Sequence, residues 1–306
     1  MTEAEERRSG LHEKVDRLDD PEVVVVDRFV DAVLTPVSFE LTPDSWLTVQ
    51  RWAEAFLARL RAHHALNAEP LSTTAFEAAF NAACDAADWE VHPADSATNR
   101  FFDTRVVIPG RGDVKLSLKA SSAKNMIRPK VHISKLTEAA WIQDARTKVN
   151  RRDQIVQLFR EYRAQTDSIV MLRCFRLRDS DSLLYELVEI PTALFEPVDE
   201  LTITQAQATT IPVPSGAETP NLSIRIDRSD AKITITGIRI EVCTVHGTWE
   251  VPNLSGVHLP DAAESSQGSL QEPDRWATSG EPSRGAVEEG AHRRSTGRAA
   301  GPDEGR

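Results

Sequence analysis

An aspartate and two lysines stand inside a stretch of sequence that otherwise reads as two strands. The stretch is FFDTRVVIPGRGDVKLSLKASSAKN (101–125), and the three residues are Asp103, Lys115 and Lys119. Aspartate and lysine are poor strand formers, so a purely structural hairpin gains nothing from them. Placed together, a carboxylate and an ammonium can hold a cation and stabilise negative charge on a reacting group. The alternative is a cross-strand salt bridge, which contributes little stability on a surface.

The turn between the two strands determines which side chains face one another. The residues PGRG (109–112) centre the hairpin near positions 110–111, because proline and glycine supply the dihedrals of a turn. An antiparallel register about that centre places Asp103 opposite residue 118 or 119. Because side chains alternate along a strand, Asp103 and Lys119 are expected on one face, together with Ser117 and Lys115.

This pattern resembles the PD-(D/E)xK nuclease superfamily and, within it, the type II restriction endonucleases. Members of that superfamily carry an acid on one strand and acid-x-lysine on the next, in a sheet flanked by helices. The resemblance covers roughly residues 70–190, and it includes the phrases FFDTRVVI, LSLKASSAKN and HISKLTEAAWIQD. It implies a restriction-endonuclease-like core and a Mg²⁺-dependent enzyme that hydrolyses phosphodiester bonds in double-stranded DNA.

Two alignments with the superfamily pattern compete. The tripeptide DVK gives Asp103, Asp113 and Lys115, whereas SLK gives Asp103, Ser117 and Lys119, with serine in place of the second acid. Geometry favours the second alignment, because Asp113 belongs to the turn and lies about 17 Å along the strand from Asp103. One metal ion does not bridge such a gap.

The resemblance implies a role for each residue of this set. Asp103 is expected to bind Mg²⁺, and Lys119 is expected to orient or deprotonate the attacking water and to stabilise developing charge. Ser117 stands in the catalytic set where the superfamily has an acid, so the site lacks one carboxylate.

Glu77 is the leading substitute for that carboxylate as a second metal ligand, because superfamily members often place a glutamate on the helix before the first strand. TAFE (74–77) is also a capping box, in which Thr74 caps the helix and Glu77 reaches back to it. Both readings of Glu77 remain open from the sequence. Glu138 is a weaker candidate.

Charge is distributed unevenly along the chain. The net charge is −11, yet residues 104–152 hold twelve Lys and Arg against three acids, which gives this segment +9 and leaves −20 elsewhere. An acidic body with one basic stretch is typical of a groove that faces a polyanion. The alternative is a solvated face whose charges are neutralised by neighbours in the fold.

Basic and polar residues around the second strand are the expected DNA contacts. The segment KNMIRPKVHISK (124–135) interleaves them with apolar residues. Such side chains can contact phosphates, and asparagine and arginine also reach base edges. The predicted DNA-binding residues are Lys115, Lys124, Asn125, Arg128, Lys130 and Lys135.

The elements that must position these residues follow from hydrophobic spacing. Helical spacing predicts helices at 44–67, 74–91, 135–149 and 152–165, and apolar or alternating runs predict strands at 168–177, 183–191, 222–228 and 231–243. This order predicts an α/β (α+β) fold with a mixed central sheet flanked by helices and a C-terminal β-hairpin.

The two ends of the chain differ in composition from the middle. Residues 253–306 are rich in Gly, Ser, Pro and Glu and lack a hydrophobic period, which predicts a disordered tail. Residues 1–20 are expected to be flexible, with room for a short charged helix, and residues 21–252 to form a single nuclease domain. The longest uncharged apolar run near the N-terminus is VVVV (23–26), so we expect neither a signal peptide nor a membrane span, and a cytoplasmic location.

A homodimer is expected, because restriction enzymes of this kind cut palindromes with two-fold symmetry. The serine at 117 keeps a second function open, namely a DNA-binding protein with an inactive nuclease fold. A repair endonuclease without sequence preference is the third. The three scattered cysteines lack the close pairs of a zinc or redox site.

Overall fold

The computed structural model describes residues 2–94, 101–145, 147–177, 182–227 and 231–252. The predicted tail at 253–306 lies outside the described residues. The described helices are α1 (Glu3–Val15), α2 (Asp20–Leu34), α3 (Gln50–Leu66), α4 (Thr73–Ala86) and α5 (Lys148–Gln165), with short 3-10 turns η1 (Ala140–Ile142), η2 (Thr192–Glu200), η3 (Gln205–Gln207) and η4 (Ile240–Val242).

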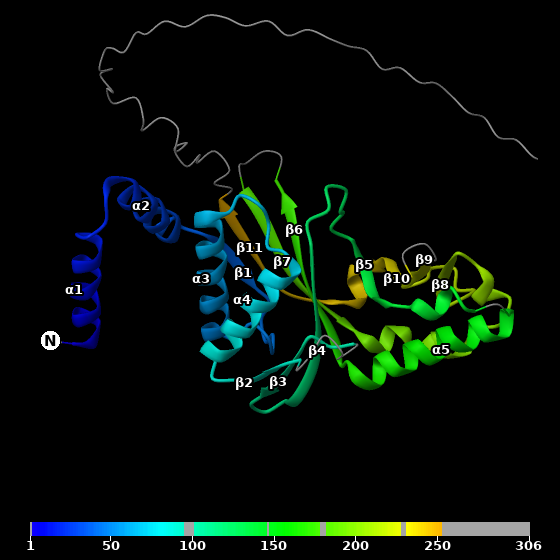
Figure 1. Cartoon of the computed structure of the whole chain (residues 1–306). Helices are drawn as coiled ribbons and strands as arrows, with labels where there is room; N and C mark the ends of the chain where they lie inside the picture. Colours follow the sequence, from blue (N-terminus) through cyan, green and yellow to red (C-terminus); the bar gives the residue numbers. More distant parts are fainter. Residues whose placement is uncertain (1, 95–100, 146, 178–181, 228–230, 253–306) are drawn as a thin grey trace, which may run out of the picture. The chain divides into compact units, whose positions relative to one another are not determined.

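The strands form two sheets (Figure 1). The larger sheet has seven strands in the order β1-β11-β7-β6-β4-β3-β2, with bounds β1 (Ser38–Leu41), β2 (Glu90–Pro93), β3 (Thr104–Ile108), β4 (Gly112–Ser121), β6 (Ser168–Arg176), β7 (Ser182–Pro191) and β11 (Thr244–Pro252). The smaller sheet has the order β5-β10-β9-β8, with bounds β5 (Lys130–Glu138), β8 (Thr210–Val213), β9 (Leu222–Asp227) and β10 (Lys232–Arg239). The seven-stranded sheet is mixed, because β4 and β6 run parallel while its other neighbours are antiparallel.

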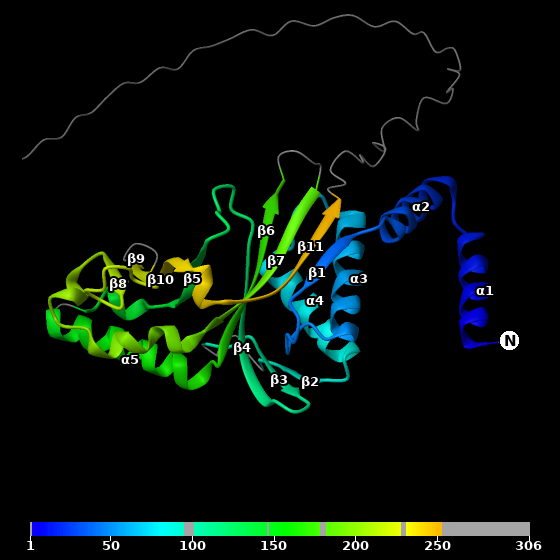
Figure 2. The same cartoon turned by 180° about the vertical axis from the view of Figure 1, so that it is seen from behind.

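Two apolar cores lie on opposite faces of the larger sheet. Strand β6 contributes to both, because Ile169 and Met171 face one core while Val170 and Leu172 face the other. Helices α3 and α4 cover the second face, and α5 with the smaller sheet covers the first, as Figures 1 and 2 show from opposite sides. The predicted fold class, a mixed sheet flanked by helices, is confirmed.

Several predicted elements are confirmed, with shifted ends. Strands β6 and β7 match the predictions, and β9 and β10 form the predicted hairpin, with Ile224 opposite Ile235. The short charged helix allowed near the N-terminus is α1. The helix predicted from residue 44 begins only at Gln50; Asp44 lies in a turn before it, with a φ of +58° that is outside the right-handed helical region.

The helix predicted at 135–149 is wrong. Residues 130–138 form strand β5, which pairs with β10 through Ile133 opposite Ile235 and Val131 opposite Ile238. Val131, Ile133 and Leu136 are buried, and a register shift lets the apolar residues keep one face although their spacing is uneven. That spacing resembles a helix in the sequence alone, and only the partner strand decides against it.

Strands at both margins of the sheet were also missed. β11 leaves the smaller sheet's hairpin and returns to the larger sheet, where it pairs with β7 and β1. The predicted helix at 74–91 ends at Ala86, and β2 occupies residues 90–93. The predicted domain boundaries stay a prediction.

Candidate active site

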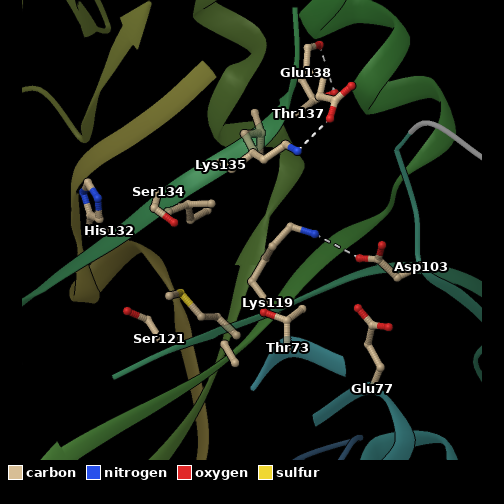
Figure 3. Close-up of a pocket in the computed structure, with 14 residues that line it drawn as sticks. Thr73, Glu77, Asp103, Lys119, Ser121, His132, Ser134, Lys135, Thr137 and Glu138 are labelled. Carbon is tan, nitrogen blue, oxygen red and sulfur yellow. Dashed lines mark hydrogen bonds and ion pairs between the residues drawn. The ribbon is translucent and has the colours of Figure 1, made fainter. Parts of the chain in front are cut away.

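A cavity of about 440 Å³ lies where α4, β4, β5 and β6 meet (Figure 3). Its walls are Thr73 and Glu77 of α4, Asp103, the end of β4 (119–121), much of β5 (132–138) and Met171 of β6. Three residues of the catalytic set predicted from the sequence, Glu77, Asp103 and Lys119, therefore meet at one concave surface.

Asp103 directly precedes β3 and is held there by the neighbouring strand. Its backbone N–H donates to the carbonyl of Leu116 at 2.8 Å. Its carboxylate oxygen Oδ2 accepts three hydrogen bonds, from Ser117 Oγ at 3.2 Å, Leu118 N at 2.6 Å and Lys119 Nζ at 3.0 Å. Of the residues that the structure describes, none donates to the other oxygen, Oδ1. One carboxylate oxygen is thus fixed by the protein, and the second is left to interact with a ligand.

The register of the hairpin differs slightly from the prediction. Thr104 pairs with Leu116 and Ile108 with Gly112, so Asp103 lies beside Ser117 and not opposite residue 118 or 119. The turn is centred on Gly110, which has a φ of +80°, and this moves the register by one or two residues. The predicted face is unaffected, because Ser117 and Lys119 both reach the Asp103 carboxylate.

Lys119 completes this half of the site. Its ammonium donates to Asp103 Oδ2 and to the carbonyl of Leu118, each at 3.0 Å. The side chain is 20% exposed and the Asp103 side chain 32%. Both groups therefore stay in contact with the cavity.

Glu77 does not cap its helix. The N-cap of α4 is Ser72, whose Oγ accepts from Ala75 N at 3.2 Å, and Thr74 lies inside the first turn. The capping box that competed for Glu77 in the sequence is therefore absent from the start of α4. Figure 3 shows the Glu77 carboxylate rising from α4 towards Asp103.

The environment of Glu77 favours its protonated form. Burial raises the pKa of Glu77, the negative charge of Asp103 raises it further, and the ammonium of Lys119 partly opposes this shift. A cation bound between Glu77 and Asp103 would offset the negative charge of Asp103 that disfavours the ionised form of Glu77.

Ser117 occupies a different place from the acid it replaces in the superfamily pattern. Its side chain is buried, 1% exposed, and it does not line the cavity. Its hydroxyl donates to Asp103 Oδ2. Ser117 therefore orients the Asp103 carboxylate and makes no contact with the cavity itself.

The opposite wall of the cavity is β5. Lys135 donates to Glu138 Oε1 at 2.7 Å, and this bond and the charge of Lys135 lower the pKa of Glu138. The negative charge of Glu138 is therefore balanced by the ammonium of Lys135, whereas Glu77 has no such ion pair among the described residues. His132 also lines this wall, and burial lowers its pKa.

The alternative acid, Asp113, lies outside the cavity. It pairs with Val107 in the hairpin, and its carboxylate accepts from Arg105 Nη1 at 3.1 Å. This arrangement agrees with the alignment that selects Ser117 and Lys119.

Comparison with known proteins assigns the chain to a family. Residues 15–251 match the SmaI family, described as type II site-specific deoxyribonuclease. The chain belongs to this family. The deoxyribonuclease is also 26% identical over 216 residues to the type II restriction enzyme SmaI of Serratia marcescens, an alignment that spans 64% of this chain and 78% of that enzyme. The resemblance to type II restriction endonucleases is confirmed, and the family favours a site-specific enzyme over the other two functions.

The predicted DNA contacts of the deoxyribonuclease fall in four places. Lys124 and Asn125 are exposed in the turn that joins β4 to β5, and Lys130 is exposed at the start of β5. Lys135 lines the cavity. Lys115 lies 5.9 Å from the centre of the Phe102 ring and does not line the cavity.

Arg128 belongs with the turn, but its guanidinium already has a partner. Its Nη2 lies 3.3 Å from Glu186 Oε1, while the side chain remains 62% exposed. Elsewhere the basic segment serves the fold, because Arg151 donates to the carbonyls of Ala206 and Ala208.

The sequence reading missed Arg173 and Glu186. These residues are paired across β6 and β7, with Arg173 Nη1 2.6 Å from Glu186 Oε2. The available signal was Arg173 within SIVMLRCFR, a strand whose residues on either side of it, 169–172 and 174–175, are apolar. Such a residue needs a buried partner, and Glu186 in LLYELVEIP is the acid that supplies it. None of the described helices is both long and apolar enough to cross a membrane.

Proposed function

We propose that the cavity hydrolyses phosphodiester bonds of double-stranded DNA with a Mg²⁺ ion bound by Asp103 and Glu77. The observation that carries this proposal is that Glu77, Asp103 and Lys119 line one cavity, two acids beside one ammonium. These are the groups that metal-assisted phosphodiester hydrolysis needs: anionic ligands for the ion and a cation near the scissile phosphate.

The donor set fits Mg²⁺ better than ions that need a full protein cage. Within the described residues there is no group of three or more His, Cys, Asp or Glu that could hold a metal ion. Mg²⁺ is commonly held by one or two carboxylates, with water and substrate phosphate oxygens completing the octahedron. When bound, the ion would polarise the scissile phosphate and lower the pKa of a water ligand.

The chain's own groups perform the remaining tasks. Leu118 N and Ser117 Oγ fix Asp103 Oδ2, which orients Oδ1 for a ligand. Lys119 has three N–H donors, of which the described residues use two. The third can orient the attacking water and stabilise the negative charge that develops on the phosphate oxygens.

The basic residues beside the cavity are assigned to the DNA backbone and bases. Lys124, Lys130 and Lys135 would contact phosphates, which supplies affinity but no sequence information. Asn125 and Arg128 carry the donor and acceptor groups that can read base edges. A homodimer would present two such sites to a palindrome.

Digestion of unmethylated phage DNA tests the proposal. With Mg²⁺ we expect discrete fragments, and with EDTA we expect intact DNA. A smear would mean cleavage without sequence preference, and cleavage that persists in EDTA would contradict the metal assignment. Sedimentation of the protein, alone and with a cut-site duplex, tests the homodimer.

A further inference from the structure

A buried arginine, Arg173, holds the turn between β4 and β5 by hydrogen bonds to its backbone carbonyls. Arg173 Nη2 donates to the carbonyls of Ile127 at 2.7 Å and Lys130 at 3.1 Å, and Nη1 donates to that of Arg128 at 3.1 Å. Glu186 Oε2 accepts from the same guanidinium at 2.6 Å. An uncharged or flexible residue cannot reproduce four bonds in one planar fork.

The pair is sealed from solvent while the turn above it is not. Arg173 and Glu186 have side chains 1% and 4% exposed. Ile127, whose carbonyl accepts from Arg173, is 53% exposed, and Lys124 and Asn125 are exposed as well. Burying a charged pair is costly, and here the pair holds the carbonyls of residues 127, 128 and 130, where the exposed turn meets β5, in one arrangement.

The turn stands at the end of the candidate active site. The last residues of β4 (119–121) form one wall of the cavity and β5 (132–138) forms another, so residues 122–129 join the two walls. Ser121, the last residue of β4, is the parallel partner of Arg173 on β6.

We propose that the 122–129 turn reads base edges next to the cleaved bond, and that Arg173 is the positioning residue that fixes this turn. The inference rests on the proposed function and names the element that makes it site-specific. Asn125 supplies one donor and one acceptor group, Lys124 supplies donors, and Ile127 supplies an apolar surface for base edges. A fixed turn leaves a wrong base unpaired, whereas a mobile one can shift to accommodate it.

Two variants release the turn without touching the cavity. Arg173→Lys keeps the positive charge but loses the fork that reaches three carbonyls. The double variant Arg173→Met with Glu186→Leu removes both charges, so no unpaired charge stays buried. Arg163→Lys is the matched control, because Arg163 likewise donates to a carbonyl, that of Phe195, and to Asp199, away from the turn.

The measurement is cleavage of a random-sequence duplex pool with sequencing of the cut ends, followed by kcat and KM on the preferred site and on single-base variants of it. In both Arg173 variants we expect discrimination at one or more positions to fall about tenfold or more. We expect kcat on the preferred site to fall by less than that. Asn125→Ala should relax discrimination at a subset of the same positions, and Arg163→Lys should change neither quantity.

Four outcomes would overturn the inference. Unchanged discrimination in a folded Arg173 variant is the first, and loss of kcat with the discrimination ratio intact is the second. The third is unchanged discrimination in Asn125→Ala together with Lys124→Ala. Failure of both Arg173 variants to fold is the fourth, because Arg173 would then be needed for the fold itself. A wild-type protein that cuts no DNA would overturn the proposed function instead.

Discussion

Two ion pairs on adjacent strands of the larger sheet show how burial separates chemistry from architecture. Lys119 on β4 pairs with Asp103 at 3.0 Å, with side chains 20% and 32% exposed. Arg173 on β6 pairs with Glu186 at 2.6 Å, with side chains 1% and 4% exposed. Both pairs join a basic strand residue to an acid, yet their surroundings give them opposite properties.

The difference lies in which atoms remain available. Both oxygens of Glu186 are engaged, Oε1 by Arg128 and Oε2 by Arg173. Among the described residues, partners engage only Oδ2 of Asp103 and two of the three N–H donors of Lys119. Removing one member of a sealed pair costs about 3–5 kcal/mol, whereas a solvent-screened pair contributes about 0–1 kcal/mol. The Lys119–Asp103 pair, the open pair, can therefore exchange partners during a reaction. The Arg173–Glu186 pair, the sealed pair, cannot.

The largest effect is expected from Asp103→Asn. The amide keeps an oxygen that accepts from Leu118 N, so the fold should survive, but the anionic ligand for Mg²⁺ is lost. Cleavage should be abolished, while DNA binding stays nearly intact or tightens because a charge that repels phosphate is gone. Plasmid cleavage and fluorescence anisotropy with a labelled duplex measure the two properties. Wild-type cleavage by this variant would remove Asp103 from the site.

Lys119→Ala should cost several orders of magnitude in cleavage rate, because it removes the cation beside the scissile phosphate. Lys115→Ala is its matched control on the same strand and face. Since Lys115 does not line the cavity, its loss should mainly weaken affinity and reduce the salt dependence of binding. Single-turnover rates at saturating enzyme, with binding measured at several salt concentrations, separate the two. The reverse ranking would restore the alignment that uses Lys115.

The open pair was predictable from the sequence and the sealed pair was not. Period-two alternation around a proline and glycine turn is a local signal, and it placed Asp103 and Lys119 on one face despite a register error. The N-cap of α4 at Ser72 and the strand β5 depend on tertiary packing. The spacing of apolar residues in β5 is also compatible with a helix, so the sequence alone does not decide between the two. Arg173 has meaning only through Glu186 and three carbonyls at 127–130, contacts that span 43 to 46 residues and leave no local pattern.

Glu77→Gln tests whether the open pair has a second acid. Because Ser72 caps α4, we expect little change in melting temperature but a loss of cleavage.

The raised pKa of Glu77 also determines the direction in which stability and Mg²⁺ affinity change with pH. Between its ordinary value of 4.5 and the raised value, the folded metal-free protein holds more protons than the unfolded chain. Its stability contribution therefore falls as pH rises through that window, and Mg²⁺ affinity rises as the proton leaves.

Calorimetric titration with Mg²⁺ across this pH range provides the measurement. Glu77→Gln should flatten the pH dependence of Mg²⁺ affinity. Glu138→Gln is the control, because Glu138 lines the same cavity but has its pKa lowered by Lys135. If both variants keep the wild-type pH dependence, neither acid is a ligand and Asp103 acts with water and phosphate alone.

The smallest effect is expected at a third pair in the same hairpin, Arg105 and Asp113. Its atoms lie 3.1 Å apart, like those of the open pair, but the side chains are 38% and 47% exposed and neither residue lines the cavity. Asp113→Asn should therefore leave the cleavage rate unchanged and cost about 0–1 kcal/mol of stability, less at high salt. Cleavage kinetics and urea unfolding at low and high salt measure both. A large loss of cleavage with an intact fold would show that an ion pair outside the cavity takes part in the reaction, and that DVK is the catalytic tripeptide after all.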